Sequence, residues 1–166
     1  DLYQLKNWTE YSVRKASHII TISQSSKKDI EDYYHIPAQK ITVVYPGIDD
    51  YFGRAISQYR IETIRKKYHL NKEYLLYLGT LQPRKNLVNL IRSYQQLIDR
   101  YPKLQLVIAG KKGWLYQDLF KGVSRSKIKN KVVFPGFIDD KDIPGLVKGA
   151  RLFVLPSFYE GFGIPV

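Results

Sequence analysis

Short apolar runs alternate with amphipathic stretches along most of the chain. The runs are rich in β-branched and aromatic residues, which favours strands, and the stretches repeat apolar residues every three or four positions, which favours helices. Strands are predicted at 18–23, 40–45, 73–79, 103–110, 130–136 and 151–156. Helices are predicted from a cap at Ser25 or Ser26 to a point before Pro37, and at 56–68, 86–101, 114–123 and 139–150.

This alternation of nearly continuous apolar strands with helices indicates a parallel sheet that is covered on both faces. Crossover connections between parallel strands are right-handed almost without exception, which leaves few arrangements for such a sheet. The predicted fold class is therefore α/β, with a Rossmann-like parallel sheet and helices on both of its faces.

Composition narrows the class of protein. The 166 residues are 44% hydrophobic and 25% charged, which is the balance of an ordinary globular protein. No apolar run is long enough to predict a membrane-spanning helix, and the first 15 residues lack the apolar core of a secretory signal. Without cysteine the chain has neither disulfides nor thiolate metal ligands, which fits a cytoplasmic protein.

The net charge of +12 is unevenly distributed along the chain. Residues 1–50 carry a net charge of −1, and residues 51–166 carry +13. A basic region of this size favours an anionic partner, which is a nucleotide, a nucleic acid or an acidic membrane surface. The alternative is a solvated basic surface without a ligand.

Glycine-containing segments follow four of the predicted strands. They are "GTLQPRKN" (79–86), "GKKGW" (110–114), "GFIDD" (136–140) and "SFYEGFG" (157–163). In an open parallel sheet the C-terminal ends of the strands share one edge, and ligands bind along that edge. Two of the four segments contain paired basic residues, so this edge is predicted to bind a large anionic ligand.

The segment "GTLQPRKN" contains the parts of a phosphate site. Gly79 permits a tight turn after the strand, and Pro83 stiffens the loop before Arg84 and Lys85, at the predicted start of a helix. A helix N-terminus attracts phosphate, an arginine can hold two phosphate oxygens, and a lysine adds a mobile charge. We therefore predict a diphosphate clamp, with an unliganded basic loop as the alternative.

The remaining segments are less specific. Lys111 and Lys112 stand between two glycines, but the chain has neither a Walker spacing nor a G-x-G-x-x-G fingerprint, which argues against nicotinamide and flavin enzymes. The backbone at 136–138 is predicted to face a flat base, whereas Asp139 and Asp140 are interpreted as ordinary residues at a helix start. The three histidines have no metal-ligand spacing.

Glu160 lies between two aromatic residues and the glycines of "EGFG", directly after the last predicted strand. It is either a carboxylate of the site or an incidental glutamate in a surface turn. Four segments, "LYLGTLQPRKNLVNLIRSY", "LVIAGKKGW", "VVFPGFIDDKDIPGLVKGA" and "VLPSFYEGFGIPV", resemble in order and spacing the C-terminal donor-binding domain of glycosyltransferase family 4, the group 1 retaining enzymes with a GT-B fold. The preceding stretch at 16–49 resembles the passage from the acceptor domain through the hinge in that family.

The resemblance implies transfer of a sugar from a nucleoside-diphosphate donor, GDP-mannose or a UDP-sugar, to a glycan or lipid-linked glycan, with retained configuration. It implies no bound metal and no separate cofactor. In the matching motifs, Arg84 and Lys85 would hold the diphosphate, the backbone at 136–138 would contact the base, and Glu160, the first of a glutamate pair, would lie by the sugar as the catalytic residue. The full set expected to contact the donor is Gly79, Thr80, Arg84, Lys85, Lys111, Gly136, Phe137, Ile138, Gly161, Phe162, Gly163 and Ile164.

Two positions depart from the family pattern. Thr80 stands where the family often has arginine, and the second glutamate would fall two positions after Val166. Residues 1–45 are predicted to be the end of the acceptor domain and the hinge, and residues 46–166 an incomplete nucleotide-sugar-binding domain. We therefore expect a piece of a longer polypeptide that is inactive by itself.

Two alternative functions remain open at this point. The first is a basic module that binds nucleic acid or another polyanion, in which some of the 14 tyrosines stack on bases. The pattern of an RRM, KH or helix-turn-helix domain is absent, so no nucleic-acid partner is expected. The second alternative is a nucleotide-binding domain without catalysis. The location predicted for the glycosyltransferase is the cytoplasm, with peripheral association at the inner face of the membrane.

Overall fold

The computed structural model describes residues 2–113, 117–124 and 126–163, and the chain divides into two compact units. The first unit contains the residues up to Ile48 together with the segment that starts at Glu160, and the second contains Asp49–Tyr159. Each unit has its own parallel sheet, with two strands in the first and four in the second. The domain boundary after residue 45 stays a prediction.

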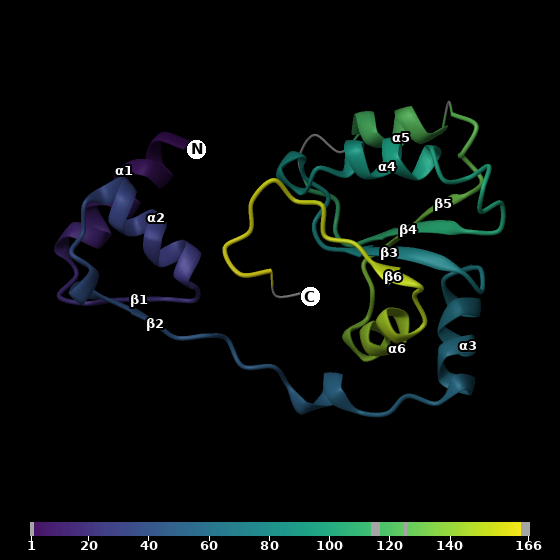
Figure 1. The fold of residues 1–166 in the computed structure, drawn as a ribbon, viewed down its shortest axis with the longest axis horizontal. Coiled ribbons are helices and arrows are strands. Elements are labelled where there is room, and N and C mark those ends of the chain that lie inside the picture. The colour runs from purple at the N-terminus through teal and green to yellow at the C-terminus, as the bar shows by residue number, and fades with distance from the viewer. Residues whose placement is uncertain (1, 114–116, 125, 164–166) are drawn as a thin grey trace. The chain divides into compact units, whose positions relative to one another are not determined.

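The first unit packs helices against a pair of short strands (Figure 1). Its elements are α1 Leu2–Lys15, β1 Ile19–Thr21, α2 Gln24–Tyr34 and β2 Ile41–Val43. The strands are parallel, with Ile19 opposite Ile41, and Val13, Ile36 and Ile41 form the buried core. The hydrophobic pattern does not predict α1, because residues 6–12 contain no aliphatic residue to mark a helical stripe.

The start of α2 lies earlier than the sequence predicts. Ser23 is the N-cap, with an extended backbone at φ −155°, and its hydroxyl accepts a hydrogen bond from the N–H of Ser26 at 3.0 Å. The predicted cap at Ser25 or Ser26 is therefore wrong, because both residues belong to the first helical turn. The helix ends where His35 adopts a left-handed conformation at φ 55°, before Pro37 as predicted.

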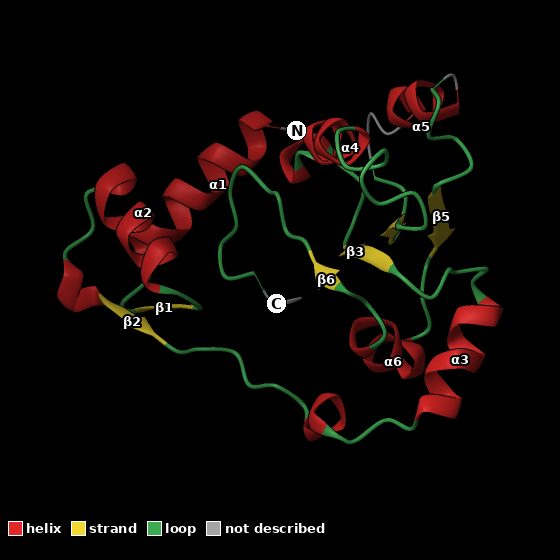
Figure 2. Cartoon of the chain, turned by 45° about the vertical axis from the view of Figure 1, so that its right-hand side comes forward, coloured by secondary structure: helices red, strands yellow, loops and turns green. Residues whose placement is uncertain are grey.

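The second unit is a four-stranded parallel sheet with the strand order β5-β4-β3-β6. Its strands are β3 Tyr74–Leu78, β4 Gln105–Ala109, β5 Val132–Gly136 and β6 Leu152–Phe153, and its α-helices are α3 Gln58–Lys67, α4 Leu87–Gln95, α5 Gln117–Ser124 and α6 Ile143–Lys148. Figure 1 shows α4 and α5 on one side of the sheet and α3 and α6 on the other, and Figure 2 shows the same helices from a second direction. The predicted α/β class with both faces covered is confirmed.

Successive side chains of β3 alternate between two cores. Leu75 and Tyr77 are buried with Leu90 of α4, whereas Tyr74 and Leu76 join a second cluster with residues of α3 and α6. Burying one large apolar side chain contributes about 2 kcal/mol to folding, so two filled faces fix the sheet between its helices. Strands buried on both faces read as continuous apolar runs, which is why the pattern was visible in the sequence.

Several elements are shorter than predicted. The helix predicted at 86–101 ends at Gln95 and continues as turns, and the strand predicted at 151–156 pairs only at Leu152 and Phe153. The helix predicted at 139–150 starts with a 3₁₀ turn, η4 Asp140–Asp142, followed by α6 with Pro144 in its first turn. Proline has no N–H to donate, so it is tolerated only at a helix start.

A buried carboxylate joins α3 to the start of α6. Asp142 is 1% exposed, and its oxygens lie 2.5 Å from Arg60 Nη2 and 2.6 Å from Lys67 Nζ, while the Tyr68 hydroxyl donates to it at 2.9 Å. Burial acts to raise the pKa of Asp142, but the hydrogen bonds from Lys67 and Tyr68 and the nearby positive charges outweigh it, so the pKa lies below its usual value. Lys67 also bonds Asp139 at 2.6 Å, so Asp139 has an ionic partner rather than only a helix N-terminal role.

We expect Asp142→Asn to lower the free energy of unfolding at pH 7 by about 2 kcal/mol, because buried hydrogen bonds to a charged acceptor are lost. A carboxyl whose pKa is lower in the folded state stabilises the fold above its unfolded pKa of about 4, and this stabilisation disappears as the pH falls through the folded-state pKa. The variant should therefore lose less stability than the wild type during acidification. Urea denaturation at a series of pH values measures both effects, with exposed Asp99→Asn as the charge-matched control; equal acid sensitivity in all three proteins would contradict the expectation.

Candidate functional site

The strand order creates a switch point at the C-terminal edge of the second sheet. From β3 the chain builds outward through β4 and β5 on one side, and β6 then joins the other side of β3. In open α/β sheets, ligands bind outside the strand ends at the point where the order reverses. The segments after β3 and β6 flank that point, and the first of them carries Arg84 and Lys85.

Three glycines stack side by side where β3, β4 and β5 end. The N–H of Gly79 donates to the Ala109 carbonyl at 2.9 Å, and the N–H of Gly110 donates to the Gly136 carbonyl at 2.7 Å. A Cβ atom on Gly110 would lie 2.0 Å from the Gly79 carbonyl oxygen, so the two backbones approach too closely for any side chain. The predicted tight turn at Gly79 thus extends to a glycine layer across three strands.

The basic pair of "GTLQPRKN" precedes its helix. Arg84 and Lys85 lie in a 3₁₀ turn, η3 Pro83–Lys85, and α4 starts at Leu87 after Asn86, which is left-handed at φ 57°. The sequence predicted both cations at the helix start, whereas the structure separates them from it by one residue. They still come directly before the uncapped first turn of α4, because the Asn86 side chain makes no capping bond.

The segments on the two sides of the switch point are bonded to each other. The Arg84 guanidinium donates to the Tyr159 carbonyl, the Phe158 N–H donates to the Arg84 carbonyl at 3.0 Å, and the Asn86 side-chain amide donates to the Pro156 carbonyl at 3.0 Å. Arg84 therefore orders the segment that leads to Glu160 in addition to its predicted role. The sequence pattern did not predict a structural role for Asn86, although an asparagine between a loop and a helix is a known signal for left-handed backbone.

The exits of β4 and β5 bring two further predicted residues together. The Lys111 ammonium lies 5.2 Å from the centre of the Phe137 ring, which is 58% exposed. Ile138 differs, because its side chain is 2% exposed and packs in the core cluster with α3 and α6. Its side chain is thus unable to contact a ligand, and the Phe137 ring is the aromatic surface at this exit. Thr80 is exposed, and its carbonyl accepts a hydrogen bond from the Tyr77 hydroxyl at 3.1 Å.

The segment from Glu160 belongs to the first unit. Its Gly161 carbonyl accepts a hydrogen bond from the Ser23 hydroxyl, and the Phe162 ring lies 6.0 Å from the Tyr45 ring. Gly163 has φ 85°, a left-handed conformation that favours glycine. Glu160 itself is half-buried. Ile164 lies outside the described residues.

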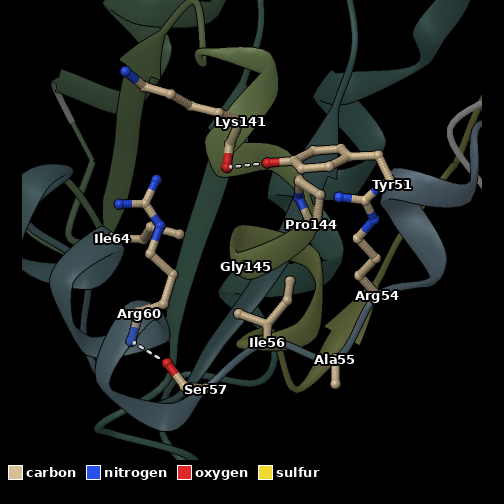
Figure 3. Close-up of a pocket in the computed structure, with 10 residues that line it drawn as sticks. All are labelled: Tyr51, Arg54, Ala55, Ile56, Ser57, Arg60, Ile64, Lys141, Pro144 and Gly145. Atoms are coloured by element: carbon tan, nitrogen blue, oxygen red, sulfur yellow. Dashed lines mark hydrogen bonds between the residues drawn. The ribbon is translucent and has the colours of Figure 1, made fainter.

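A separate pocket of about 370 Å³ lies between the segment 51–57 and helices α3 and α6 (Figure 3). Arg54 and Arg60 stand on opposite sides of it, and the Tyr51 hydroxyl donates to the Lys141 carbonyl at 2.9 Å. None of the residues predicted to contact the donor lines this pocket. Across the described part of the chain there is no group of three His, Asp or Glu residues that could hold a metal, and no helix long and apolar enough to cross a membrane.

Matches to protein-family models show to which family the chain belongs. Residues 60–166 match the family model described as "Glycosyl transferases group 1", and residues 2–52 match the model described as "Glycosyltransferase Family 4". The chain belongs to the group 1 glycosyl transferases. This membership confirms the resemblance that the four strand-exit segments indicated.

Individual relatives agree with this family. The chain is 35% identical over 158 residues to the O-antigen chain mannosyltransferase B of Escherichia coli, covering 93% of the chain and 41% of the relative. It is 32% identical over 158 residues to the serotype-specific mannosyltransferase WbdA of the same species, covering 91% of the chain and 19% of the relative. The chain therefore spans less than half the length of these relatives.

Several solved structures share the fold of the chain. HepE of Anabaena, crystallised in complex with UDP and glucose, matches with a TM-score of 0.80 and 25% identity over 99% of the chain and 44% of its own. WaaG, a glycosyltransferase involved in lipopolysaccharide biosynthesis, matches with a TM-score of 0.75 and 19% identity over 99% of the chain and 47% of its own, which supports the fold alone.

Proposed function

We propose that the chain is the donor-binding part of a retaining glycosyltransferase, which moves a sugar from a nucleoside-diphosphate donor to an acceptor hydroxyl. One observation carries the proposal: the basic segment after β3 and the segment after β6 flank the switch point and are bonded to each other through Arg84. Membership of the group 1 glycosyl transferases and the mannosyltransferase names of the relatives support it.

The proposed chemistry is a substitution at the anomeric carbon. The bond from that carbon to the β-phosphate oxygen breaks, and its electron pair leaves with the diphosphate. The acceptor oxygen bonds to the same face of the sugar, and its proton passes to the oxygen of the leaving diphosphate. Arg84 and Lys85 neutralise the charge that builds on the leaving diphosphate, and Glu160 lies beside the transferred sugar. The proposal needs no metal, since these cations and the uncapped start of α4 supply the positive charge.

The base subsite of the proposal lies at the exits of β4 and β5. The exposed Phe137 ring offers a flat surface for a base, and the positive charge of Lys111 beside this ring favours binding of an anionic ligand. The mannosyltransferase relatives favour GDP-mannose as the donor. A UDP-sugar is the second candidate donor, because the structural neighbour HepE was crystallised with UDP and glucose. The O-antigen names favour a glycan or lipid-linked glycan acceptor at the cytoplasmic face of the membrane.

Ligand-induced thermal shifts test this function and its donor. We expect GDP at 100 times its dissociation constant to stabilise the protein by about 2.7 kcal/mol, which raises the melting temperature by roughly 5–10 °C. UDP at the same concentration should raise it less, and single-stranded DNA should produce no specific shift. If neither nucleotide binds and DNA binds with a steep dependence on salt, the protein is a polyanion-binding module and the proposal fails.

A further inference from the structure

Ser23 connects the start of α2 to the glycine-rich segment that follows Glu160. Ser23 is 7% exposed, and its hydroxyl accepts the hydrogen bond from the Ser26 N–H at 3.0 Å and donates to the Gly161 carbonyl. The Ser23 hydroxyl also lies 3.1 Å from the Ser26 hydroxyl. The Ser26 hydroxyl lies 3.4 Å from the same carbonyl oxygen. Two residues separated from Gly161 by more than a hundred positions thus hold one peptide group of the segment.

The chemistry of the hydroxyl permits both bonds at once. A serine hydroxyl has one proton to donate and two lone pairs that accept. The Ser26 N–H occupies a lone pair as the helix cap. The hydroxyl proton has two acceptors within reach, the Gly161 carbonyl and the Ser26 hydroxyl at 3.1 Å, and the Gly161 carbonyl is the nearer of the two. Replacement of Ser23 can therefore remove the cap and the bond to Gly161 together or separately, depending on the new side chain.

Fixing this carbonyl also fixes the amide that follows it. The atoms of a peptide group lie in one plane, and in the trans form the C=O and the next N–H point in opposite directions. A Gly161 carbonyl bonded to Ser23 therefore turns the Phe162 N–H away from Ser23. The contact between the Phe162 and Tyr45 rings, 6.0 Å apart, restrains the same segment on its other side. Gly161 follows Glu160 directly, so the orientation of one residue limits that of the other.

We propose that Ser23 is a positioning residue for Glu160, which holds the Gly161–Phe162 peptide and with it the neighbouring glutamate in one orientation. The proposal rests on the proposed function, since it assigns Glu160 to the transferred sugar. The Ser23 hydroxyl itself touches no reacting atom. The role is a different one from helix capping, which the same side chain also performs.

The test compares four variants of the protein. Ser23→Ala loses the cap and the bond to Gly161, Ser23→Asp keeps a cap acceptor but has no proton for Gly161, and Ser23→Thr keeps both. The matched control is Ser57→Ala, because the Ser57 hydroxyl caps α3 by accepting from the Arg60 N–H at 3.2 Å. This control loses an equivalent cap without a change near Gly161.

Loss of one hydrogen bond in the site corresponds to about a tenfold fall in rate. We expect Ser23→Ala and Ser23→Asp to lower kcat for sugar transfer by about this factor, with the dissociation constant of GDP or UDP within twofold of the wild type. Hydrogen exchange at the amides of 161–163 should accelerate in both variants. Ser23→Thr should match the wild type, and Ser57→Ala should lower only the melting temperature.

Each other outcome has a defined meaning. Wild-type rates and exchange in Ser23→Asp would overturn the positioning role, because this variant keeps the cap and stays folded even if Ser23→Ala does not. Equal losses of rate in Ser57→Ala would assign the effect to helix stability and overturn it as well. A wild-type protein that neither binds GDP or UDP nor transfers sugar would overturn the proposed function instead, and the exchange rates at 161–163 would then decide alone whether Ser23 orders the segment.

Discussion

Replacing Arg84 and Lys85 together with alanine should weaken GDP or UDP binding at least about a hundredfold, because each residue supplies charge-assisted hydrogen bonds of about 1.5–3 kcal/mol to the diphosphate. Binding of the free nucleoside should change less than about twofold. Part of the loss comes from the segment after β6, because Arg84 holds this segment in place through its bond to the Tyr159 carbonyl. Titration calorimetry with the nucleotide and the nucleoside measures the difference.

The control for this experiment removes the same charge elsewhere. Lys66 and Lys148 are exposed at the ends of α3 and α6, so their double replacement by alanine lowers the net charge equally. We expect this control to bind nucleotide within about threefold of the wild type, since exposed charges at a distance are screened by salt. Equal losses for nucleotide and nucleoside in the Arg84 and Lys85 variant, or an equal loss in the control, would remove both residues from the diphosphate role.

The second large effect is expected at Gly110. A Cβ atom there would lie 2.0 Å from the Gly79 carbonyl oxygen, and the backbone has φ 138°, where residues with side chains are strained. Gly110→Ala should therefore lower the free energy of unfolding by on the order of 3–5 kcal/mol, from overpacking and backbone strain together. Chemical denaturation of the purified variant measures this loss.

Gly122 is the matched control for this substitution. It lies in α5, and a Cβ atom on it would meet nothing within 4 Å. Gly122→Ala should raise the free energy of unfolding by about 0.5–1 kcal/mol, because alanine has a smaller entropy cost in a helix. A Gly110→Ala variant as stable as the wild type would show that the glycine layer at the strand ends is not required by close backbone contact.

The sequence predicted the sheet and its edge because both depend on local pattern. Strands buried on two faces appear as apolar runs, and backbone with a positive φ favours glycine, as at Gly110 and Gly136. These two signals led to the correct fold class and to the strand exits as the candidate site. The structure adds the strand order, which shows that the segment carrying Arg84 and the segment after β6 flank the switch point.

What the sequence could not predict depends on contacts between distant residues. The bond from Arg84 to the Tyr159 carbonyl spans 75 positions, and the ion pair between Arg60 and Asp142 spans 82. The burial of the Ile138 side chain depends on the helices on its face of the sheet. The cap at Ser23 was missed for a different reason, since several serines in one short stretch satisfy the same local rule and only the backbone conformation selects among them.

Hydrogen exchange with and without nucleotide tests the central claim, that the strand exits of the second sheet bind the donor. At saturating GDP or UDP, we predict slower exchange in peptides that cover 79–86, 110–113 and 136–139, with no change in the segment 51–57 beside the separate pocket. Slower exchange confined to the segment 51–57 and α6 would place the nucleotide in that pocket, and no change anywhere at saturation would show that the exits bind no nucleotide. Either result would contradict the proposed donor site.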